Sequence, residues 1–434
     1  MTEYTSEKVE YTLGQAARGT RHRRLGAVAR LAVASAVCVG LAVLLLHLTS
    51  GCSHRRVPAA RAAVETEPLL RTTHPREGVR AGDADDPAIW IHPTDPSLSL
   101  VLGTLKQHGL DVYDLDGQVL QTINPGKVRY NNVDVAYGFV LGRAATDLAV
   151  VTDPRNDRLV IFRIDRRTRW LEDVTDAANG PIFTPPGQEP ERKAAALGLA
   201  LYRSPKTDRF YAFVTRQGRG EVVQLELLDD GGGRVKTRRV RSLALSAPEG
   251  VNPQAEGMVT DEDAGVLYLA QEKVGISKVP AEPNGDAAVT LVDAVAPRGR
   301  GLRADVEGLT IYRGAGGVGY LIASSQGDDT FAVFSLADDN RYLGSFRVAD
   351  GEGIDGAERT DGAAAVGAPL GPRFPAGLLV VQDGKDKPGL TAGKDGKHKH
   401  PSTNFKFVAW EQVARAFTPP LSDTPERDLR VVRR

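Results

Sequence analysis

Acidic and amide side chains recur where short apolar strands are expected to begin. They precede five of six such strands, at Asp85 and Asp86, Asn132, Glu256, Glu307 and Asp361. Carboxylate and amide oxygens without His or Cys are the ligands that hard cations prefer, and Ca²⁺ tolerates irregular geometry best. The alternative is that Asp-Gly and Glu-Gly pairs only form turns. Because the pattern keeps the same register in five units, we favour a calcium site.

These side chains meet only if the strands that follow them converge. Intervals of 46, 66, 58, 51 and 54 residues separate the successive strand starts at Asp86, Asn132, Gly198, Glu256, Glu307 and Asp361. Each start is followed by further apolar strands, and a helical pattern first occurs at Glu411–Phe417. Periods near 50 residues with about four strands per unit are typical of a β-propeller. We therefore predict an all-β, six-bladed β-propeller over residues 83–420, with the acidic residues ringing one mouth of its channel.

The composition excludes several classes of protein. The 434 residues include 55 Lys+Arg and 55 Asp+Glu, and this balance argues against a nucleic-acid binder. The 46 Gly and 26 Pro favour many short turns over a helical bundle. The two cysteines, Cys38 and Cys52, are too few for a disulfide framework or a zinc cluster.

The first 52 residues are typical of an export signal. Four arginines within residues 18–24 precede an uncharged stretch over Leu31–Leu46, which is shorter than the ~20 residues of a membrane-spanning helix. Small residues before Cys52 resemble a lipoprotein cleavage box, and an uncleaved N-terminal helix is the alternative tether. Both interpretations predict a protein outside the cytoplasm, secreted or lipid-anchored to the outer face of the membrane. After removal of residues 1–52 no cysteine remains, which excludes a thiol nucleophile.

The rest of the chain is divided by composition. Residues 53–82 lack periodicity and are interpreted as a linker, and residues 421–434 as a C-terminal tail. A closed propeller needs no partner to cover its edges, so we expect a monomer.

Several longer motifs resemble those of β-propeller phytases. They are Asp83-Ala-Asp-Asp-Pro-Ala-Ile-Trp90, Asn131-Asn-Val-Asp134, Asp305-Val-Glu-Gly-Leu-Thr-Ile-Tyr312, Tyr320-Leu-Ile-Ala-Ser-Ser-Gln-Gly327 and Asn404-Phe-Lys-Phe-Val-Ala-Trp410. The resemblance extends from about Glu65 to Val413. It implies a six-bladed propeller with several Ca²⁺ ions that hydrolyses phosphomonoesters of inositol hexakisphosphate.

The resemblance also implies a set of site residues. The implied calcium ligands are Glu65, Asp85, Asp86, Asn131, Asn132, the Val133 backbone, Glu256, Glu272, Glu307, Asp355, Asp361, Gln382 and Asp383. Of these, Asp85, Glu256, Glu307 and Asp361 are expected to serve catalysis, with a calcium-activated water attacking phosphorus directly. Lys106, Arg155 and a third-blade arginine, Arg216 or Arg219, are expected to bind substrate phosphate.

Three positions depart from the family pattern, and two functions remain open. Gln107 stands where a second lysine is common, Leu197 replaces a tyrosine and Gln271 replaces a glutamate. The first hypothesis is a calcium-dependent phytase. The second is a non-catalytic calcium-binding propeller that captures phosphorylated ligands at the cell surface, because propellers serve both purposes.

Overall fold

The structure is a computed structural model that describes residues 57–71, 80–191, 193–387 and 402–425. The predicted export segment, the lipid attachment at Cys52 and the alternative N-terminal helix lie outside the described residues. Among the residues described, no helix is both long and apolar enough to cross a membrane.

Blades 1 to 3 are four-stranded antiparallel sheets formed by consecutive strands. Blade 1 contains β4 (Pro87–Trp90), β5 (Leu100–Thr104), β6 (Leu110–Tyr113) and β7 (Val119–Ile123). Blade 2 contains β8 (Val133–Leu141), β9 (Ala144–Asp153), β10 (Arg158–Ile164) and β11 (Leu171–Asp173). Blade 3 contains β12 (Ala196–Arg203), β13 (Phe210–Arg216), β14 (Glu221–Asp229) and β15 (Val235–Ala244).

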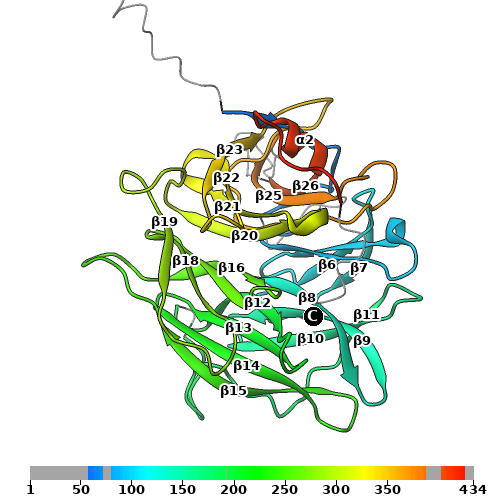
Figure 1. Ribbon diagram of the computed structural model, residues 1–434. Helices are drawn as coiled ribbons and strands as arrows, with labels where there is room; N and C mark the ends of the chain where they lie inside the picture. Colours follow the sequence, from blue (N-terminus) through cyan, green and yellow to red (C-terminus); the bar gives the residue numbers. More distant parts are fainter. Residues whose placement is uncertain (1–56, 72–79, 192, 388–401, 426–434) are drawn as a thin grey trace, which may run out of the picture. The chain divides into compact units, whose positions relative to one another are not determined.

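Blades 4 to 6 continue the pattern and confirm the predicted six-bladed, all-β fold. Blade 4 contains β16 (Ala255–Asp261), β17 (Val266–Gln271), β18 (Gly275–Pro280) and β19 (Thr290–Ala294). Blade 5 contains β20 (Val306–Arg313), β21 (Gly319–Ser325), β22 (Thr330–Ser335) and β23 (Tyr342–Val348). Blade 6 contains β24 (Ala363–Val366), β25 (Leu378–Asp386) and β26 (Ser402–Ala409). The first strands of neighbouring blades contact one another around a closed ring, and Figure 1 shows β8, β12, β16 and β20 inside β11, β15 and β19.

The segment predicted as a linker is instead part of the propeller. β1 (Ala59–Ala60) pairs in parallel with β23, whereas β2 (Val64–Glu65) and β3 (Leu69–Leu70) pair with β26. β2 thereby supplies the outer strand of blade 6, so the N-terminal boundary predicted at residue 83 is wrong. Strands of two residues carry no periodicity, and their pairing depends on edges more than 280 residues away in sequence.

The C-terminal boundary predicted at residue 420 also excludes residues that pack on the propeller. The predicted helix is confirmed as α2 (Trp410–Arg415), and the Trp410 ring stacks on Tyr312 at 3.6 Å between ring centroids. The Trp410 indole donates to the carbonyl of Ser422, whose amide donates to the Tyr320 hydroxyl. The first residues of the tail therefore belong to the contact between blades 5 and 6.

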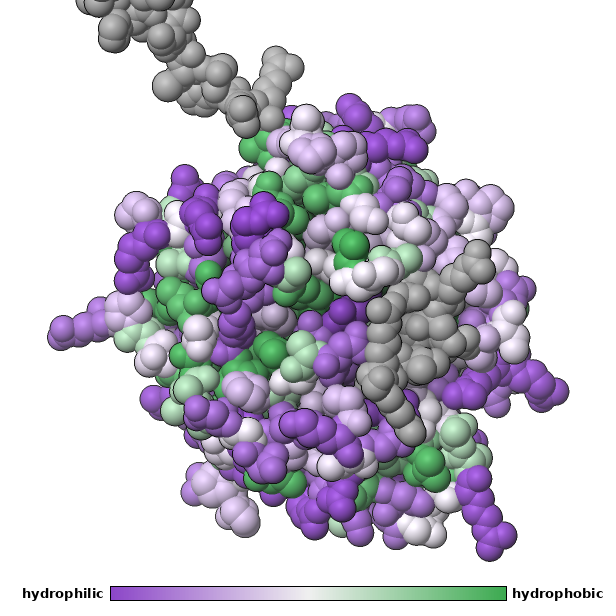
Figure 2. Space-filling view, viewed as in Figure 1, coloured by the Kyte–Doolittle hydropathy of each residue, from purple (hydrophilic) through white to green (hydrophobic). Residues whose placement is uncertain are grey.

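Apolar clusters fill the space between adjacent blades. One cluster joins Trp90 and Leu102 of blade 1 to Val151 and Phe162 of blade 2, and five others occupy the remaining blade pairs. Each blade is thus buried on both faces, which explains why its central strands are apolar without strict alternation. The face of the molecule seen in Figure 2 is mostly hydrophilic.

Glycines near the start of the first strands allow neighbouring blades to approach each other closely. A Cβ atom on Gly198 would lie 2.0 Å from the Glu256 carbonyl oxygen, and one on Gly257 would lie 2.1 Å from the Glu307 carbonyl oxygen. A Cβ atom on Gly362 would lie 2.4 Å from a carboxylate oxygen of Asp86. Because Gly257 and Gly308 lie within β16 and β20 and have no positive φ, the turn interpretation is wrong for the Glu256-Gly257 and Glu307-Gly308 pairs.

The first strands line a central cavity of about 760 Å³. It extends from Asp86 and Asn132 to Asp134, Glu262 and Arg313 toward the other end of the strands. Burial, assisted by Asp134, raises the pKa of Glu262 to about 7, although the Arg203 amide donates to its carboxylate at 2.9 Å.

Gly257→Ala should disrupt the contact between blades 4 and 5. The new methyl group would overlap the backbone carbonyl of Glu307, which cannot move independently of β20, and we expect a loss of several kcal/mol of stability, on the order of an overpacked core. Gly180→Ala is the control, because a methyl group added at that residue would meet no atom within 4 Å and the backbone there has no positive φ. Thermal unfolding of the two variants measures the difference, and equal melting temperatures would contradict the close-approach argument.

Glu262→Gln should stabilise the protein more at alkaline than at acidic pH. The native carboxyl holds a proton up to about pH 7 and the unfolded one only up to about 4.5, so stability falls as pH rises between these values. Glutamine keeps an acceptor for the Arg203 amide and removes this cost, which we expect to be roughly 3 kcal/mol at about pH 8. Unfolding at about pH 4 and pH 8 tests this, with exposed Glu172→Gln as control. A gain independent of pH would contradict it.

Candidate functional site

Threonine hydroxyls at the ends of second strands hold the predicted ligand turns. Thr104 Oγ1 donates to the Asn131 carbonyl at 2.6 Å and accepts from the Asp86 amide at 3.0 Å. Thr152 Oγ1 similarly accepts from the Asn132 amide at 3.1 Å and donates to a carbonyl of β12 at 2.6 Å. Each hydroxyl therefore ties the beginning of one first strand to the beginning of the next, at the mouth that the sequence predicted.

β-Bulges aim the carboxylates of blades 4 and 5. The register of β16 on β17 and of β20 on β21 shifts at Glu256-Gly257 and at Glu307-Gly308, where two residues oppose one. Such an extra residue redirects a side chain at the end of a sheet. β12 has the same shift, but Leu197 occupies the corresponding position and is buried. Blade 3 thus keeps the geometry and contributes no carboxylate there.

Lys106 forms one half of the site together with two of the predicted catalytic carboxylates. Its Nζ lies 3.0 Å from Asp85 Oδ1 and 3.2 Å from Asp361 Oδ2. Burial opposes the charge on Lys106, but Asp85 and Asp361 outweigh it and raise the pKa of the ammonium group above its usual range. Gln326 Nε2 donates to the other oxygen of Asp361 at 2.7 Å.

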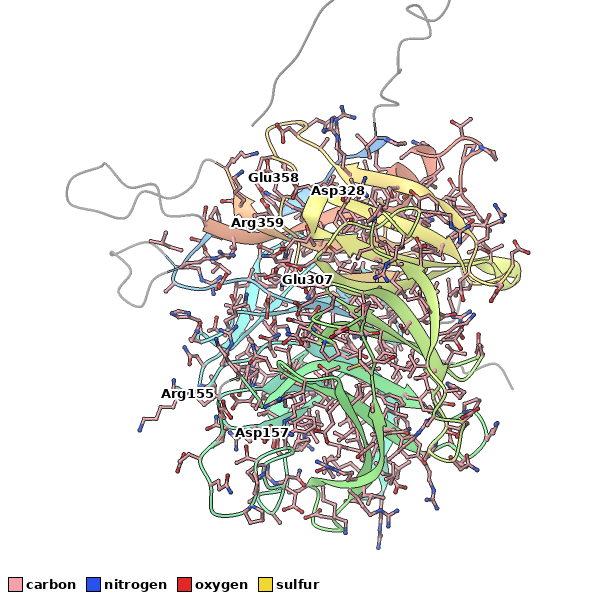
Figure 3. The ribbon with its side chains drawn as sticks, turned by 90° about the vertical axis from the view of Figure 1, so that its left-hand side faces the viewer. Arg155, Asp157, Glu307, Asp328, Glu358 and Arg359 are labelled. Carbon is pink, nitrogen blue, oxygen red and sulfur yellow. The ribbon has the colours of Figure 1, made fainter. Side chains whose placement is uncertain are left out.

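Three glutamates form the other half. Glu256, Glu272 and Glu307 each place a carboxylate oxygen within 4.8 Å of the other two. Burial, reinforced by Asp361, raises the pKa of Glu256 to about 7, and burial with Glu256 and Glu272 raises that of Glu307 well above its usual range. Asn131 Nδ2 donates to Glu256 Oε1 at 2.6 Å, which attaches the blade 2 turn to this group. Figure 3 shows Glu307 among the side chains inside the domain.

The donor set fits a hard cation. Burial raises the pKa of Asp85 and of Asp86 well above the usual range, and Asp85 Oδ2 is buried without a hydrogen-bond partner. Asp86 Oδ2 accepts from the Val133 amide at 3.0 Å. A divalent cation would offset the repulsion between these crowded oxygen ligands, and it would provide a partner for the unpaired carboxylate oxygen. The acidic residues could therefore hold a metal ion.

The remaining predicted acidic ligands form a separate cluster around Lys406. The buried ammonium group contacts Glu65 and Asp355, and lies 3.3 Å from Asp386 Oδ1 and 3.6 Å from Asp383 Oδ2. Burial raises the pKa of Asp383 to about 6. Glu65, Asp355 and Asp386 also place carboxylate oxygens within 4.8 Å of one another. Because Glu65 lies on β2, this cluster links β2 to the other strands of blade 6.

Gln382 has a positioning role in the structure. Its Oε1 accepts from the Asp361 amide at 2.7 Å, and its Nε2 donates to the Ala84 carbonyl at 3.1 Å. Both polar atoms are thus engaged with the backbone that carries Asp361 and Asp85.

Two predicted phosphate-binding arginines differ from Lys106 in their surroundings. Arg155 is exposed and extends away from the strands in Figure 3. Arg216 donates to the Ala194 carbonyl at 2.8 Å and to Glu221 at 3.0 Å, and lies over the Phe183 ring. Lys106 is the predicted cation that the structure brings into contact with the carboxylates.

Sequence reasoning missed Lys406, Asp386, Gln326 and Arg129. A signal existed for Lys406, because a lysine inside the apolar run Phe405–Val408 needs buried acidic partners. Gln326 follows β21 at the start of η3 (Gln326–Asp328), on the same side as the other site residues, but its contact with Asp361 crosses from blade 5 to blade 6. Arg129 lies beside Asn131, and its Nη2 donates to Asn131 Oδ1 at 3.5 Å.

Comparisons with known proteins identify the family to which the chain belongs. The family described as Phytase matches residues 32–433. A 3-phytase from Bacillus subtilis (strain 168) is 40% identical over 341 residues, covering 78% of this chain and 82% of that protein. Among solved structures, a protein of unknown function from Bacteroides thetaiotaomicron has a TM-score of 0.45 at 12% identity, covering 81% of this chain and 75% of that one. AofleA from Arthrobotrys oligospora has a TM-score of 0.42 at 12% identity, covering 74% and 88%. Because the family match spans most of the sequence, this chain belongs to the phytase family.

Proposed function

We propose that this protein is a calcium-dependent phytase that hydrolyses phosphomonoester bonds of inositol hexakisphosphate by direct attack of water on phosphorus. Membership of the phytase family supports a phytate-hydrolysing phosphatase. The observation that carries the calcium requirement is the convergence of Glu256, Glu272 and Glu307 beside the Lys106 ion pairs.

Electrostatics require a cation before such a site can accept its substrate. A phosphomonoester dianion is repelled by a group of carboxylates that hold no compensating positive charge. Calcium, when bound, would supply that charge and would polarise the phosphoryl group toward attack by water. Asp85, Asp86, Asn131, Asn132, the Val133 backbone, Glu256, Glu272, Glu307 and Asp361 are the residues that would hold it at this mouth.

The chain's own groups have distinct roles in this proposal. Lys106 Nζ, held by Asp85 and Asp361, contacts a phosphoryl oxygen and stabilises the charge that develops in the transition state. Glu256, whose carboxylate converges with those of Glu272 and Glu307, would hold the cation beside this lysine. Gln326 and Gln382 keep Asp361 in place. Residues 53–434 contain no cysteine, so a thiol intermediate within this segment is excluded.

A non-catalytic calcium-binding propeller is the second candidate. Leu197 favours it, because an apolar side chain occupies the bulge position that carries a carboxylate in blades 4 and 5. Such a protein would still bind calcium and phosphorylated ligands, but it would release no phosphate.

We also propose that the protein acts outside the cytoplasm as a monomer. The basic and apolar N-terminal segment supports export. Cys52 supports a lipid anchor. If Cys52 is unmodified, the protein would be secreted or tethered by its N-terminal helix. Phytate is a soluble, highly charged substrate, so an enzyme on the outer face of the membrane would meet it without transport.

Calcium should control the activity. We expect the full chain to release phosphate from inositol hexakisphosphate with millimolar Ca²⁺ and to lose this activity in excess chelator, because the carboxylates then repel the substrate. A colorimetric phosphate assay measures both conditions. Equal release in both would contradict the calcium requirement. A folded protein that binds Ca²⁺ and releases no phosphate in either condition would favour the binding propeller.

Asp361→Ala should abolish turnover without unfolding the protein. The variant removes a carboxylate that contacts Lys106, and we expect kcat to fall by a factor on the order of 10² to 10³. Asp116→Ala is the matched control, since that side chain is 67% exposed and pairs only with exposed Arg373 among the described residues. Circular dichroism verifies the fold of both. Unchanged turnover in Asp361→Ala would show that the site is assigned wrongly.

A further inference from the structure

Gln254 connects blade 3 to the glutamate group, which is formed by Glu256, Glu272 and Glu307. Blade 3 contributes no carboxylate to this group, because an apolar side chain occupies its bulge position. Gln254 directly precedes β16, and its two polar atoms reach different blades. Its Nε2 donates to Glu272 Oε1, whereas its Oε1 accepts from the Gly218 amide. Among the described residues, no other side-chain hydrogen bond links blade 3 to the glutamate group.

The Gly218 amide lies in a tightly packed turn. This blade 3 turn (residues 216–220) joins β13 to β14 and carries Arg216 and Arg219. The φ of Gly218 is +68°, and a Cβ atom there would lie 2.8 Å from the Lys193 carbonyl oxygen. The Arg219 amide donates to the Arg216 carbonyl at 3.2 Å, which closes the turn. The bond from Gly218 to Gln254 therefore acts on the segment that carries the third-blade arginines.

The backbone around Gln254 is fixed by the buried Gln271. Its Nε2 donates to the carbonyls of Ser246 and Pro253, each at 3.1 Å. An ionised glutamate at this position could make neither bond, because a carboxylate has no N–H group. The Glu272 amide donates in turn to the Gln254 carbonyl at 3.3 Å. The Gln254 side chain therefore extends from a fixed backbone position.

We propose that Gln254 is a positioning residue that transmits cation binding at the glutamate group to the blade 3 turn, which becomes more rigid when Ca²⁺ is bound. Because Gln254 donates to Glu272, a restriction on that carboxylate passes through the amide to Gly218. The coupling is reciprocal, since an ordered turn also holds Gln254 against Glu272. The inference rests on the proposed function, which supplies the cation.

The electrostatic surroundings of Glu272 suit this role. Burial raises the pKa of Glu272, and the bond from Gln254 opposes this shift because it favours the ionised carboxylate. The ionised form is the one that binds a hard cation. The amide carries no charge, so it does not compete with a cation as Lys106 does at Asp85 and Asp361. Gln254 thus prepares Glu272 for a cation without neutralising it.

Hydrogen–deuterium exchange of the full chain, with and without Ca²⁺, tests the coupling directly. In the wild type, we expect Ca²⁺ to slow exchange over residues 216–221. Gln254→Met keeps the length of the side chain and removes both bonds, so this calcium response should disappear even at saturating Ca²⁺. Glu272→Gln keeps an acceptor for Gln254 and removes a cation ligand, so it should show wild-type exchange without Ca²⁺ and no response to it. Gln118 is exposed on blade 1, so the control Gln118→Met should respond as the wild type does.

Calorimetry and kinetics distinguish this role from a merely structural one. We expect Gln254→Met to bind Ca²⁺ about tenfold more weakly, at the lower end of what the loss of an outer-shell partner costs. At saturating Ca²⁺, its KM for inositol hexakisphosphate should rise several-fold while kcat changes less, because the turn carries arginines and no cation ligand. A structural defect alone would lower the melting temperature and leave the calcium response in place.

Three results would overturn the proposal. They are a calcium response retained in Gln254→Met, a response absent from a wild type that binds Ca²⁺, and equal behaviour of Gln254→Met and Gln118→Met. If Gln254→Met does not fold by circular dichroism, Glu272→Gln decides, and a retained response there would contradict the coupling. Phosphate release tests the proposed function separately. A wild type that shows the response but releases no phosphate would contradict the phytase activity and leave the role of Gln254 intact.

Discussion

Close packing of the first strands around the channel is the constraint on which the site depends. Glycine at positions such as 198 and 257 brings each first strand against the carbonyl of the next, at a distance where no Cβ atom fits. The residue before Gly257 is Glu256, and the residue before Gly308 is Glu307, so the same contact brings carboxylates together. Packing energy from the six apolar clusters between the blades therefore opposes the repulsion between like charges at the axis.

The protein resolves this repulsion in two different ways. Lys106 neutralises Asp85 and Asp361, and Lys406 neutralises the cluster that contains Glu65 and Asp386, so both groups carry an internal cation. No lysine or arginine among the described residues forms an ion pair with Glu256, Glu272 or Glu307. Their raised pKa values express the cost of ionising them without one. A bound external cation therefore stabilises the protein most at the site that lacks an internal cation.

Repeated patterns were predictable from the sequence, whereas contacts between distant segments were not. The period of the strand starts indicated the six blades, and acidic residues at one register indicated a shared mouth because equivalent positions in a propeller converge. The strands β1 and β2 escaped prediction, since two residues carry no pattern and their partners lie in blades 5 and 6. The contacts of Gln326 and Arg129 depend on side-chain directions across two blades. The glycines at the strand starts could be recognised in the sequence, but their structural role could not, because close approach of two backbones and turn formation both favour glycine.

Blade 3 separates what the fold requires from what the chemistry requires. β12 has the same bulge as β16 and β20, and Gly198 makes the same close contact with the next blade, yet Leu197 precedes it. The glycine therefore serves the close contact between first strands in blades 3 to 5, independently of charge. A carboxylate is needed only where its oxygen faces the group formed by Glu256, Glu272 and Glu307. Substitutions at the glycines should thus act on stability first, and substitutions at the residues before them on metal binding and turnover, which is why Leu197 is compatible with an intact propeller.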